Sequence, residues 1–94
     1  MWAMVVEVDI EDGRNDESEK VLNETTIPAV KSQEGFVRGM WLRSVDRTSG
    51  RGVVVFDSEE HAQASKNLLS AQGPPAGAAV KVLSIDVFEI VAEA

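Results

Sequence analysis

The sequence predicts an α+β fold in which two helices cover one face of a four-stranded antiparallel sheet. Two β-rich runs flank a five-residue connection that ends in glycine, Asp46 to Gly50, which is the pattern of a β-hairpin with a longer loop. One helical pattern separates this hairpin from an apolar N-terminal run, and a second separates it from an alternating C-terminal run. The order is therefore β-α-β-β-α-β, the split βαβ or ferredoxin-like topology.

The chain is short and acidic. Its 94 residues predict a single domain, 1–94, with a formal net charge of −7. Because phosphate contacts need clustered Lys and Arg, this balance argues against a nucleic-acid partner. Cysteine is absent, so no disulfide and no thiolate-bound metal are expected. The opening apolar run, Trp2–Val6, is too short to span a bilayer and no leader pattern precedes it, so we expect a cytoplasmic protein with no membrane partner.

The first strand and the first helix are predicted from their patterns and caps. The strand covers Met1–Ile10, where a continuous apolar run passes into alternation, as in a central strand. The helix is expected to run from about Glu17 to Gln33. Asp16 is its expected N-cap, and Glu19 stands three residues on to complete a capping box.

Proline and glycine interrupt the chain between this helix and the hairpin. Pro28 removes one backbone hydrogen bond, so we expect the helix to kink or break near Thr25–Ile27. Gly35 is expected to end the helix in the left-handed conformation. The hairpin strands then follow as Phe36–Val45 and Arg51–Asp57.

The second helix and the last strand complete the order. Asp57 and Glu60 stand at capping-box spacing and begin the helix, which is expected to stop by Ser70–Gln72. Small residues at Gly73–Gly77 form a connector that cannot be regular structure. The last strand, Val80–Val91, alternates apolar and polar residues.

Two strands carry continuous apolar runs, Trp2–Val6 and Val53–Phe56. Right-handed crossovers place the first and third strands side by side at the centre of the sheet, where such runs belong. Neither run leaves one face of the sheet polar, and two helices shield only one face. A second apolar face marks an interaction surface. We therefore expect a homodimer in which two sheets pack face to face and form an α/β barrel.

Two stretches carry a resemblance to a known family. They read I-P-A-V-K-S-Q-E-G-F-V-R-G-M-W-L-R at Ile27–Arg43 and V-V-V-F-D-S-E-E-H-A at Val53–Ala62. With the order of elements, they resemble the dimeric α/β-barrel superfamily in its antibiotic-biosynthesis-monooxygenase-like branch, over nearly the whole chain. The resemblance implies the same barrel, with a pocket between sheet and helices in each subunit. It also implies activities such as cofactor-free oxidation of polycyclic aromatics, haem breakdown or isomerisation.

His61 is the candidate catalytic residue. It is the only histidine, and so the only side chain with an unperturbed pKa near neutrality. In the implied pocket it would act as a general base or hydrogen-bond donor. The alternative is a surface histidine in the first turn of a helix, among Glu59 and Glu60. The haem-degrading members use an Asn on the first strand and a Trp and His downstream. This chain has no Asn on that strand, so those roles are not transferred.

The candidate substrate-binding residues lie in the hairpin. Trp41 offers a stacking plane to an aromatic ligand, and its alternative place is the core or the dimer interface. Arg38 and Arg43 could hold an anionic substrate, because guanidinium presents a planar fork to carboxylate or phosphate. Their alternative role is charge balance with acids on neighbouring strands or the partner subunit. Those acids are Glu7, Asp9, Asp86 and Glu89.

Neither a metal nor a cofactor is expected. The acidic run that begins at Asp9 departs from a calcium loop, because its glycine comes one place early and Lys20 takes the place of the bidentate acid. Three functions stay open: a cofactor-free monooxygenase-like enzyme for a small aromatic or polyketide-like substrate, a non-catalytic dimeric module that binds a small ligand or a protein, and, in last place, a purely structural dimer. A pocket of about 300 Å3 or more, lined by His61 and Trp41 together, would favour the enzyme.

Overall fold

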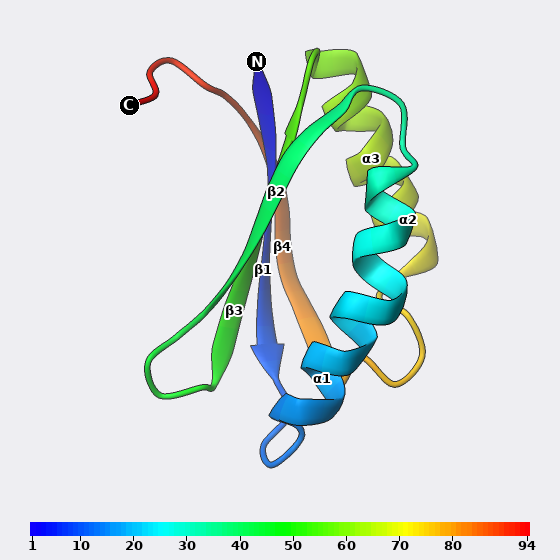
Figure 1. The fold of residues 1–94 in the computed structure, drawn as a ribbon, viewed down its shortest axis with the longest axis vertical. Helices are drawn as coiled ribbons and strands as arrows, with labels where there is room; N and C mark the ends of the chain where they lie inside the picture. The colour runs from blue at the N-terminus through cyan, green and yellow to red at the C-terminus, as the bar shows by residue number, and fades with distance from the viewer.

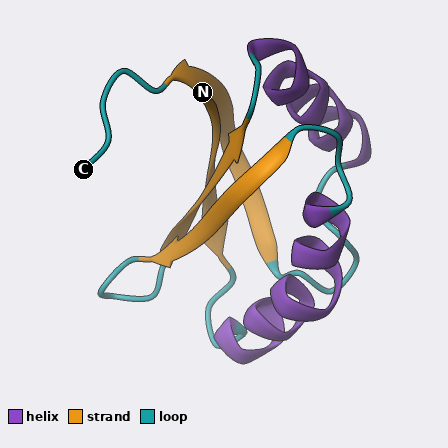
Figure 2. Cartoon of the chain, turned by 45° about the horizontal axis from the view of Figure 1, so that its top comes forward, coloured by secondary structure: helices purple, strands orange, loops and turns teal.

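The computed structural model describes all 94 residues and confirms the predicted order of elements, with the first helix divided into three segments (Figure 1). The elements are β1 (Trp2–Ile10), α1 (Asn15–Val21), η1 (Leu22–Thr26), α2 (Ile27–Lys31), β2 (Phe36–Arg43), β3 (Ser49–Phe56), α3 (Glu59–Gln72) and β4 (Val80–Glu89). The antiparallel sheet has the order β2-β3-β1-β4, so the two strands predicted at the centre do lie there. All helices cover the same face of the sheet (Figure 2).

The core lies between the central strands and the helices. Met4 on β1 pairs with Val54 on β3, and both side chains are buried under the helices. Phe56 at the end of β3 is fully buried, and Val30 of α2 and Ala62 of α3 close this cluster from above. The continuous apolar runs of β1 and β3 thus supply the centre of the core.

A bulge in β2 changes which of its residues share a face. Phe36 pairs with Phe56 and Arg38 pairs with Val55, so one extra residue stands in β2 between the two pairs. Phe36 therefore packs against the core together with Trp41. Simple alternation of the sequence predicts that Phe36 and Arg38 share a face of the sheet. This prediction is wrong, because the extra residue between them reverses the alternation.

A second bulge has the same effect in β4. Val8 of β1 pairs with Val82 and Glu7 pairs with Ser84, which leaves Leu83 as the extra residue. Leu83 is 47% exposed, while Ile85 and Val87 beyond the bulge pack against the core. Alternation along the last strand predicts Leu83, Ile85 and Val87 on one face. The bulge removes Leu83 from this set.

The first helix is interrupted as predicted, but its start and end differ. The N–H of Ile27 bonds the carbonyl of Leu22, five residues back, which makes Leu22–Thr26 a π-helical segment that Ile27 separates from Pro28. The helix begins at Asn15 rather than Glu17, and no side chain caps it, so Asp16 is not its N-cap. It ends at Lys31, and Gly35 then adopts a φ of 81°.

The second helix and the hairpin loop differ by one or two residues from the predictions. Ser58 caps α3 in place of Asp57, and its Oγ accepts a hydrogen bond from the N–H of His61 at 3.1 Å. The hairpin loop is 44–48, so β3 begins before Arg51. The Asp46 carboxylate accepts hydrogen bonds from Thr48 and Ser44, which lower the pKa of Asp46 and fix the loop.

The sheet face opposite the helices carries an apolar strip at its centre, as the sequence predicted. Its members follow from the strand pairings and are Ala3, Val5, Met40, Leu42, Val53, Val55 and Phe88. Met40 is 48% exposed and Phe88 is 54% exposed. An ion pair of 3.5 Å between Glu7 and Arg51 borders the strip, and Arg38 pairs with Glu93 of the C-terminal tail, which leaves the sheet on this side (Figure 2).

No helix of the chain is long and apolar enough to cross a membrane. No group of three His, Asp or Glu side chains is placed to hold a metal ion.

Candidate ligand cavity between the sheet and the helices

A cavity of about 710 Å3 lies between the helix-covered face of the sheet and the helices. Helices α1, η1 and α2 form one wall, α3 forms another, and the sheet is the floor. Half of the 32 lining residues are hydrophobic. The apolar walls include Met4, Val6, Leu22, Val30, Trp41, Val54, Leu68 and Leu69. Small-molecule sites in proteins use clefts of this size with apolar walls and a few polar groups.

Two glycines form a bare floor beneath Trp41. Gly52 lines the cavity from β3 and pairs with Trp41, and Gly39 stands two residues before Trp41 on β2. A Cβ added at Gly39 would lie 2.9 Å from Cη2 of Trp41, and one added at Gly52 would lie 3.0 Å from its Nε1. The indole therefore rests flat on the strand backbones, and only glycine permits this approach. We did not single out these glycines from the sequence, although a glycine inside a strand signals such a close approach.

The polar end of the cavity is formed by Arg43, where β2 ends. Its Nη1 donates to Oδ1 of Asn15 at 3.2 Å, and its Nη2 lies 3.4 Å from Oε2 of Glu19. All three residues line the cavity. Both contacts are long for hydrogen bonds to a guanidinium, and the side chain of Arg43 is 31% exposed. The cation is therefore available to an anionic group of a ligand.

His61 does not line this cavity. It sits in the first turn of α3, and its Nδ1 donates to Oδ1 of Asp57 at 2.6 Å. Its Nε2 lies 3.6 Å from Oε1 of Glu34. The hydrogen bond to Asp57 raises the pKa of His61, against the opposing effect of burial, and it lowers the pKa of Asp57. The structure does not bring His61 and Trp41 together, so a catalytic His61 stays a prediction without support from this geometry.

Arg38 also lies away from the cavity. The β2 bulge places it on the opposite face of the sheet, where it pairs with Glu93. Of the four candidates, Trp41 and Arg43 thus meet at one cavity, while Arg38 and His61 do not. Both arginines have acidic partners, but Glu93 and Glu19 replace the strand acids that we considered.

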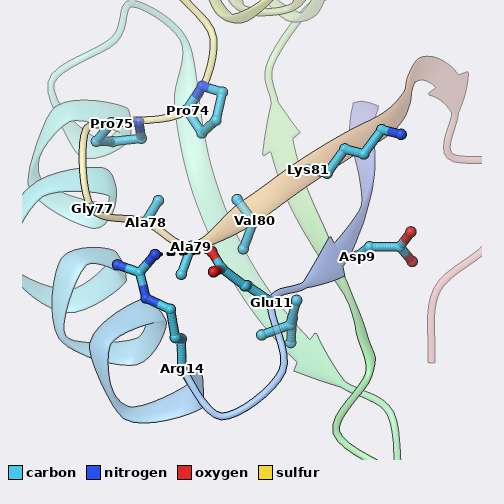
Figure 3. A pocket seen from close by; sticks show the side chains of 11 residues that line it. Asp9, Glu11, Arg14, Pro74, Pro75, Gly77, Ala78, Ala79, Val80 and Lys81 are labelled. Carbon is cyan, nitrogen blue, oxygen red and sulfur yellow. Dashed lines mark hydrogen bonds and ion pairs between the residues drawn. The ribbon is translucent and has the colours of Figure 1, made fainter.

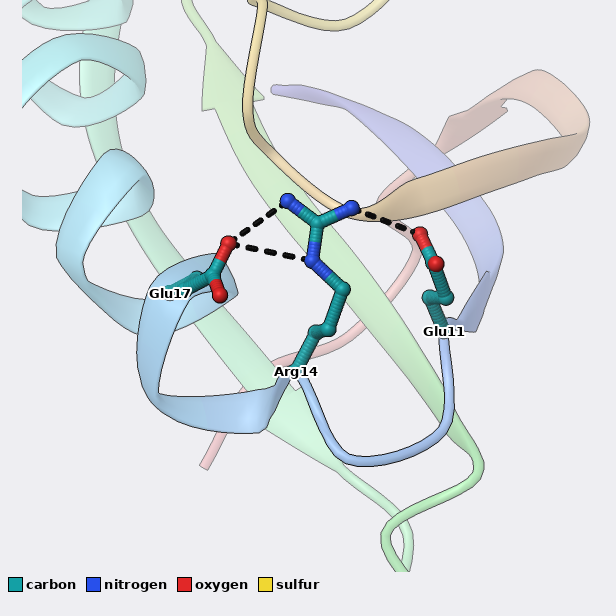
Figure 4. A network of polar contacts seen from close by, with 3 residues as sticks. All are labelled: Glu11, Arg14 and Glu17. Carbon is teal, nitrogen blue, oxygen red and sulfur yellow. Dashed lines mark hydrogen bonds and ion pairs between the residues drawn. The ribbon is translucent and has the colours of Figure 1, made fainter.

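A second, shallower groove of about 530 Å3 lies where the loop after α3 enters β4 (Figure 3). Its cation, Arg14, is already held by carboxylates on both sides, at 2.9 Å from Glu11 and 2.6 Å from Glu17 (Figure 4). The hydrogen bond to Glu17 is the largest cause that raises the pKa of Arg14. Asp9 and Lys81 at the groove are neighbours on paired strands. Because the charged groups of this groove already have partners of opposite charge, it offers no free charge to a ligand.

Comparison with known proteins shows likeness in structure alone. No protein-family model matches the sequence, and no curated protein matches it. The haem degrader MhuD from Mycobacterium tuberculosis, with two haems bound in its active site, is 23% identical with a TM-score of 0.79, over 100% of this chain and 99% of that chain. The cofactor-independent oxygenase SnoaB from Streptomyces nogalater is 18% identical with a TM-score of 0.73, over 98% of this chain and 95% of that chain.

HapK from Hahella chejuensis is 12% identical with a TM-score of 0.69, over 100% of this chain and 96% of that chain. These likenesses confirm the fold that the sequence predicted. It is the ferredoxin-like arrangement, with helices on one face of a four-stranded antiparallel sheet.

Proposed function

We propose that the chain is a dimeric α/β-barrel protein that acts as a monooxygenase-like enzyme on a small aromatic substrate held in the cavity between sheet and helices. One observation carries the proposal: an apolar cavity of about 710 Å3 holds both an aromatic plane, Trp41, and a cation, Arg43. Its volume lies within the range of about 300–1,000 Å3 that small-molecule sites occupy. The fold is shared with an oxygenase that needs no cofactor.

Each side chain has a role in binding. Trp41, flat on its glycine floor, offers one broad face of the indole to a planar ligand. Arg43 supplies a fork of donors for an enolate, phenolate or carboxylate. Because its contacts with Asn15 and Glu19 are long, Arg43 can turn toward a ligand without losing a strong hydrogen bond.

The reaction that suits this site uses the substrate as its own reductant. A base takes a proton from an acidic C–H bond, and the resulting carbanion gives its electrons to dioxygen and bonds one oxygen. The peroxide takes up a proton and loses water, so that a CH2 group and O2 become C=O and H2O. Glu19 is the only carboxylate that lines the cavity, and we propose it as the proton acceptor, with Arg43 beside it to stabilise the carbanion.

Haem breakdown fits this cavity poorly. The axial ligands that hold haem iron are most often His, Cys or Tyr side chains, and none of these lines the cavity. The one histidine of the chain, His61, lies outside it and is bonded to Asp57. The haem-binding site of the MhuD structure is therefore not proposed for this chain.

A second candidate function is a non-catalytic module that binds a small ligand. It is favoured by the position of His61, because the cavity then contains no side chain with an ordinary pKa near neutrality. In this case Trp41 and Arg43 keep their binding roles and no reaction with dioxygen takes place. Binding and oxygen consumption, measured separately, distinguish the two functions.

The test uses anthrone, a tricyclic aromatic with an acidic C–H bond, with calorimetry to follow binding and an oxygen electrode to follow turnover. We expect saturable binding that Trp41→Ala abolishes and Trp2→Phe leaves intact. Oxygen uptake that Glu19→Gln removes supports the enzyme, and His61→Ala then shows whether His61 contributes. Binding without oxygen uptake supports the module. If anthrone does not bind, or binds equally well to Trp41→Ala, the proposed site is wrong.

The apolar strip on the opposite face of the sheet supports a homodimer as the working form. Two copies joined through this strip would bury exposed side chains such as Met40 and Phe88. Each copy would keep its own cavity on the helix side. A cytoplasmic location stays a prediction of the sequence.

A further inference from the structure

Resting on the ligand cavity proposed above, we infer that Ser65 donates a hydrogen bond to the carbonyl oxygen of the ligand, so that the preferred substrates are aromatic ring ketones. Ser65 lies on α3 and lines the cavity. It is 4% exposed and is the only polar residue that the fold buries. A hydroxyl in such a position needs a hydrogen-bond partner, because a buried polar group without one costs free energy.

The hydroxyl of Ser65 has no partner within the chain. A serine inside a helix often bonds a backbone carbonyl three or four residues back, as Ser32 does with the carbonyl of Ala29 at 2.7 Å, but Ser65 makes no such bond. The only unpaired side-chain N or O atom of the buried structure that is closed to water is Oε1 of Gln33, so Oγ of Ser65 is open. Because Ser65 lines the cavity and is otherwise buried, its hydroxyl opens into the cavity.

The fold does not require a hydroxyl at this position. Ala62, three residues earlier on the same face of α3, is fully buried in the core, and Leu68 and Leu69 line the cavity one turn later. Alanine in place of Ser65 would fit this apolar face with a higher helix propensity and no unpaired group. A ligand therefore explains the hydroxyl better than packing does.

The chemistry of the proposed substrate identifies the atom that Ser65 meets. A C–H bond of an aromatic ring system is acidic when a conjugated carbonyl group takes up the negative charge as the proton leaves. The carbonyl oxygen is thus an acceptor in the ketone and a stronger acceptor in the enolate. Glu19 lines the cavity from α1 and Ser65 lines it from α3, so the proton and the carbonyl oxygen are met from different walls.

The experiment compares anthraquinone-2-sulfonate with anthracene-2-sulfonate, which share the ring outline and the anion and differ in the carbonyl groups. Calorimetry on the full chain gives the ratio of the two dissociation constants for wild type, Ser65→Ala and Ser32→Ala. We expect Ser65→Ala to reduce the preference for the quinone about three- to tenfold, which is the effect of one hydrogen bond. Ser32→Ala is the matched control on the cavity wall and should keep the wild-type ratio, because its hydroxyl is already bonded.

A second measurement separates ligand binding from stability. Because the hydroxyl of Ser65 has no partner in the free protein and alanine favours helices, Ser65→Ala should unfold at the same temperature as the wild type or at a higher one. A lower unfolding temperature would show that the hydroxyl serves the fold, and would overturn the inference.

The outcomes separate this inference from the proposed function. An unchanged ratio in Ser65→Ala, as a water molecule held on Oγ would produce, overturns the inference and leaves the ligand cavity standing. Equal weakening of both probes does the same, because it reports packing and not a hydrogen bond. So does a failure of both probes to bind where anthrone binds. If anthrone does not bind either, the proposed function fails and the inference fails with it.

Discussion

Nδ1 of His61 donates a hydrogen bond to Oδ1 of Asp57 across 2.6 Å, and this contact ties the first turn of α3 to the end of β3. Glu34, in the turn before β2, lies 3.6 Å from the other ring nitrogen. The histidine thus joins two connections at one end of the sheet. Its acidic surroundings are Asp57, Glu34 and Glu60, and each of them raises the pKa of His61.

The stability of the protein should depend on pH through this pair. Because the pKa of His61 is raised on folding, its contribution is complete below the unfolded value near 6.5 and is lost as pH rises through the folded value. Because the pKa of Asp57 is lowered, its contribution is present above about 3.8 and is lost as pH falls through the folded value. Thermal unfolding of wild type and His61→Gln should therefore differ most between about pH 4 and 6.5. A difference that stays constant up to pH 9 would contradict this assignment.

Gly35→Ala should destabilise the fold more than the same change at Gly13. Both glycines have positive φ, 81° and 74°, so each change costs about 1 kcal/mol in backbone strain. At Gly35 the new Cβ would also lie 2.2 Å from Nδ1 of His61 and 2.6 Å from Oδ1 of Asp57, whereas nothing lies within 4 Å at Gly13. We expect an additional loss of about 1–3 kcal/mol in denaturant unfolding. Equal losses of unfolding free energy at Gly35 and Gly13 would show that His61 and Asp57 move away from the new Cβ without cost, and would contradict the prediction.

Gly52→Ala should displace Trp41. The added Cβ would lie 3.0 Å from Nε1 and 3.2 Å from Cδ1 of the indole, so the ring must lift into the cavity. We expect a loss of about 1–3 kcal/mol in stability, a changed near-ultraviolet circular dichroism signal and weaker binding of planar aromatics. Gly73→Ala is a control for the contact with Trp41 alone: its Cβ meets nothing within 4 Å, and its φ of 70° adds a backbone strain of about 1 kcal/mol that Gly52→Ala does not have. Unchanged ligand binding in Gly52→Ala would contradict the role of Trp41 in the proposed site.

Val53→Lys should separate the proposed homodimer. Val53 lies between Val5 and Met40 on the apolar strip, so two buried ammonium groups would face the interface without partners. Dimer affinity measured by sedimentation should fall on the order of a hundredfold or more. Val45→Lys is the matched control, because Val45 is fully exposed at 104% in the hairpin loop. A monomeric wild type would refute the dimer, and so would a Val53→Lys variant that stays dimeric.

The order and centre of the sheet could be predicted because they depend on patterns that a strand carries within itself. The apolar runs Trp2–Val6 and Val53–Phe56 needed burial on both faces, and only central strands provide it. Pro28 likewise predicted the interruption of the first helix, because it removes a backbone hydrogen bond. The two bulges escaped prediction, because Leu83 and the residue before Arg38 are ordinary strand residues whose extra place appears only against a partner strand.

The site was only half predictable for a related reason. Trp41 and Arg43 could be singled out as chemical groups, and both line the cavity. His61 was assigned to the cavity by its chemistry alone, but Asp57, the residue proposed as a helix cap, bonds its ring instead. Ser58 and Asp57 are both capable caps, and only the folded chain decides between them.

The flat seat of Trp41 on Gly39 and Gly52 has a consequence for how the protein would evolve toward new substrates. A flat indole limits the thickness of a ligand and does not restrict its outline. Rings could be added to a flat guest, or rearranged, without a clash from below. Discrimination would then fall to the helices above, whose side chains can change one at a time while the sheet stays as it is.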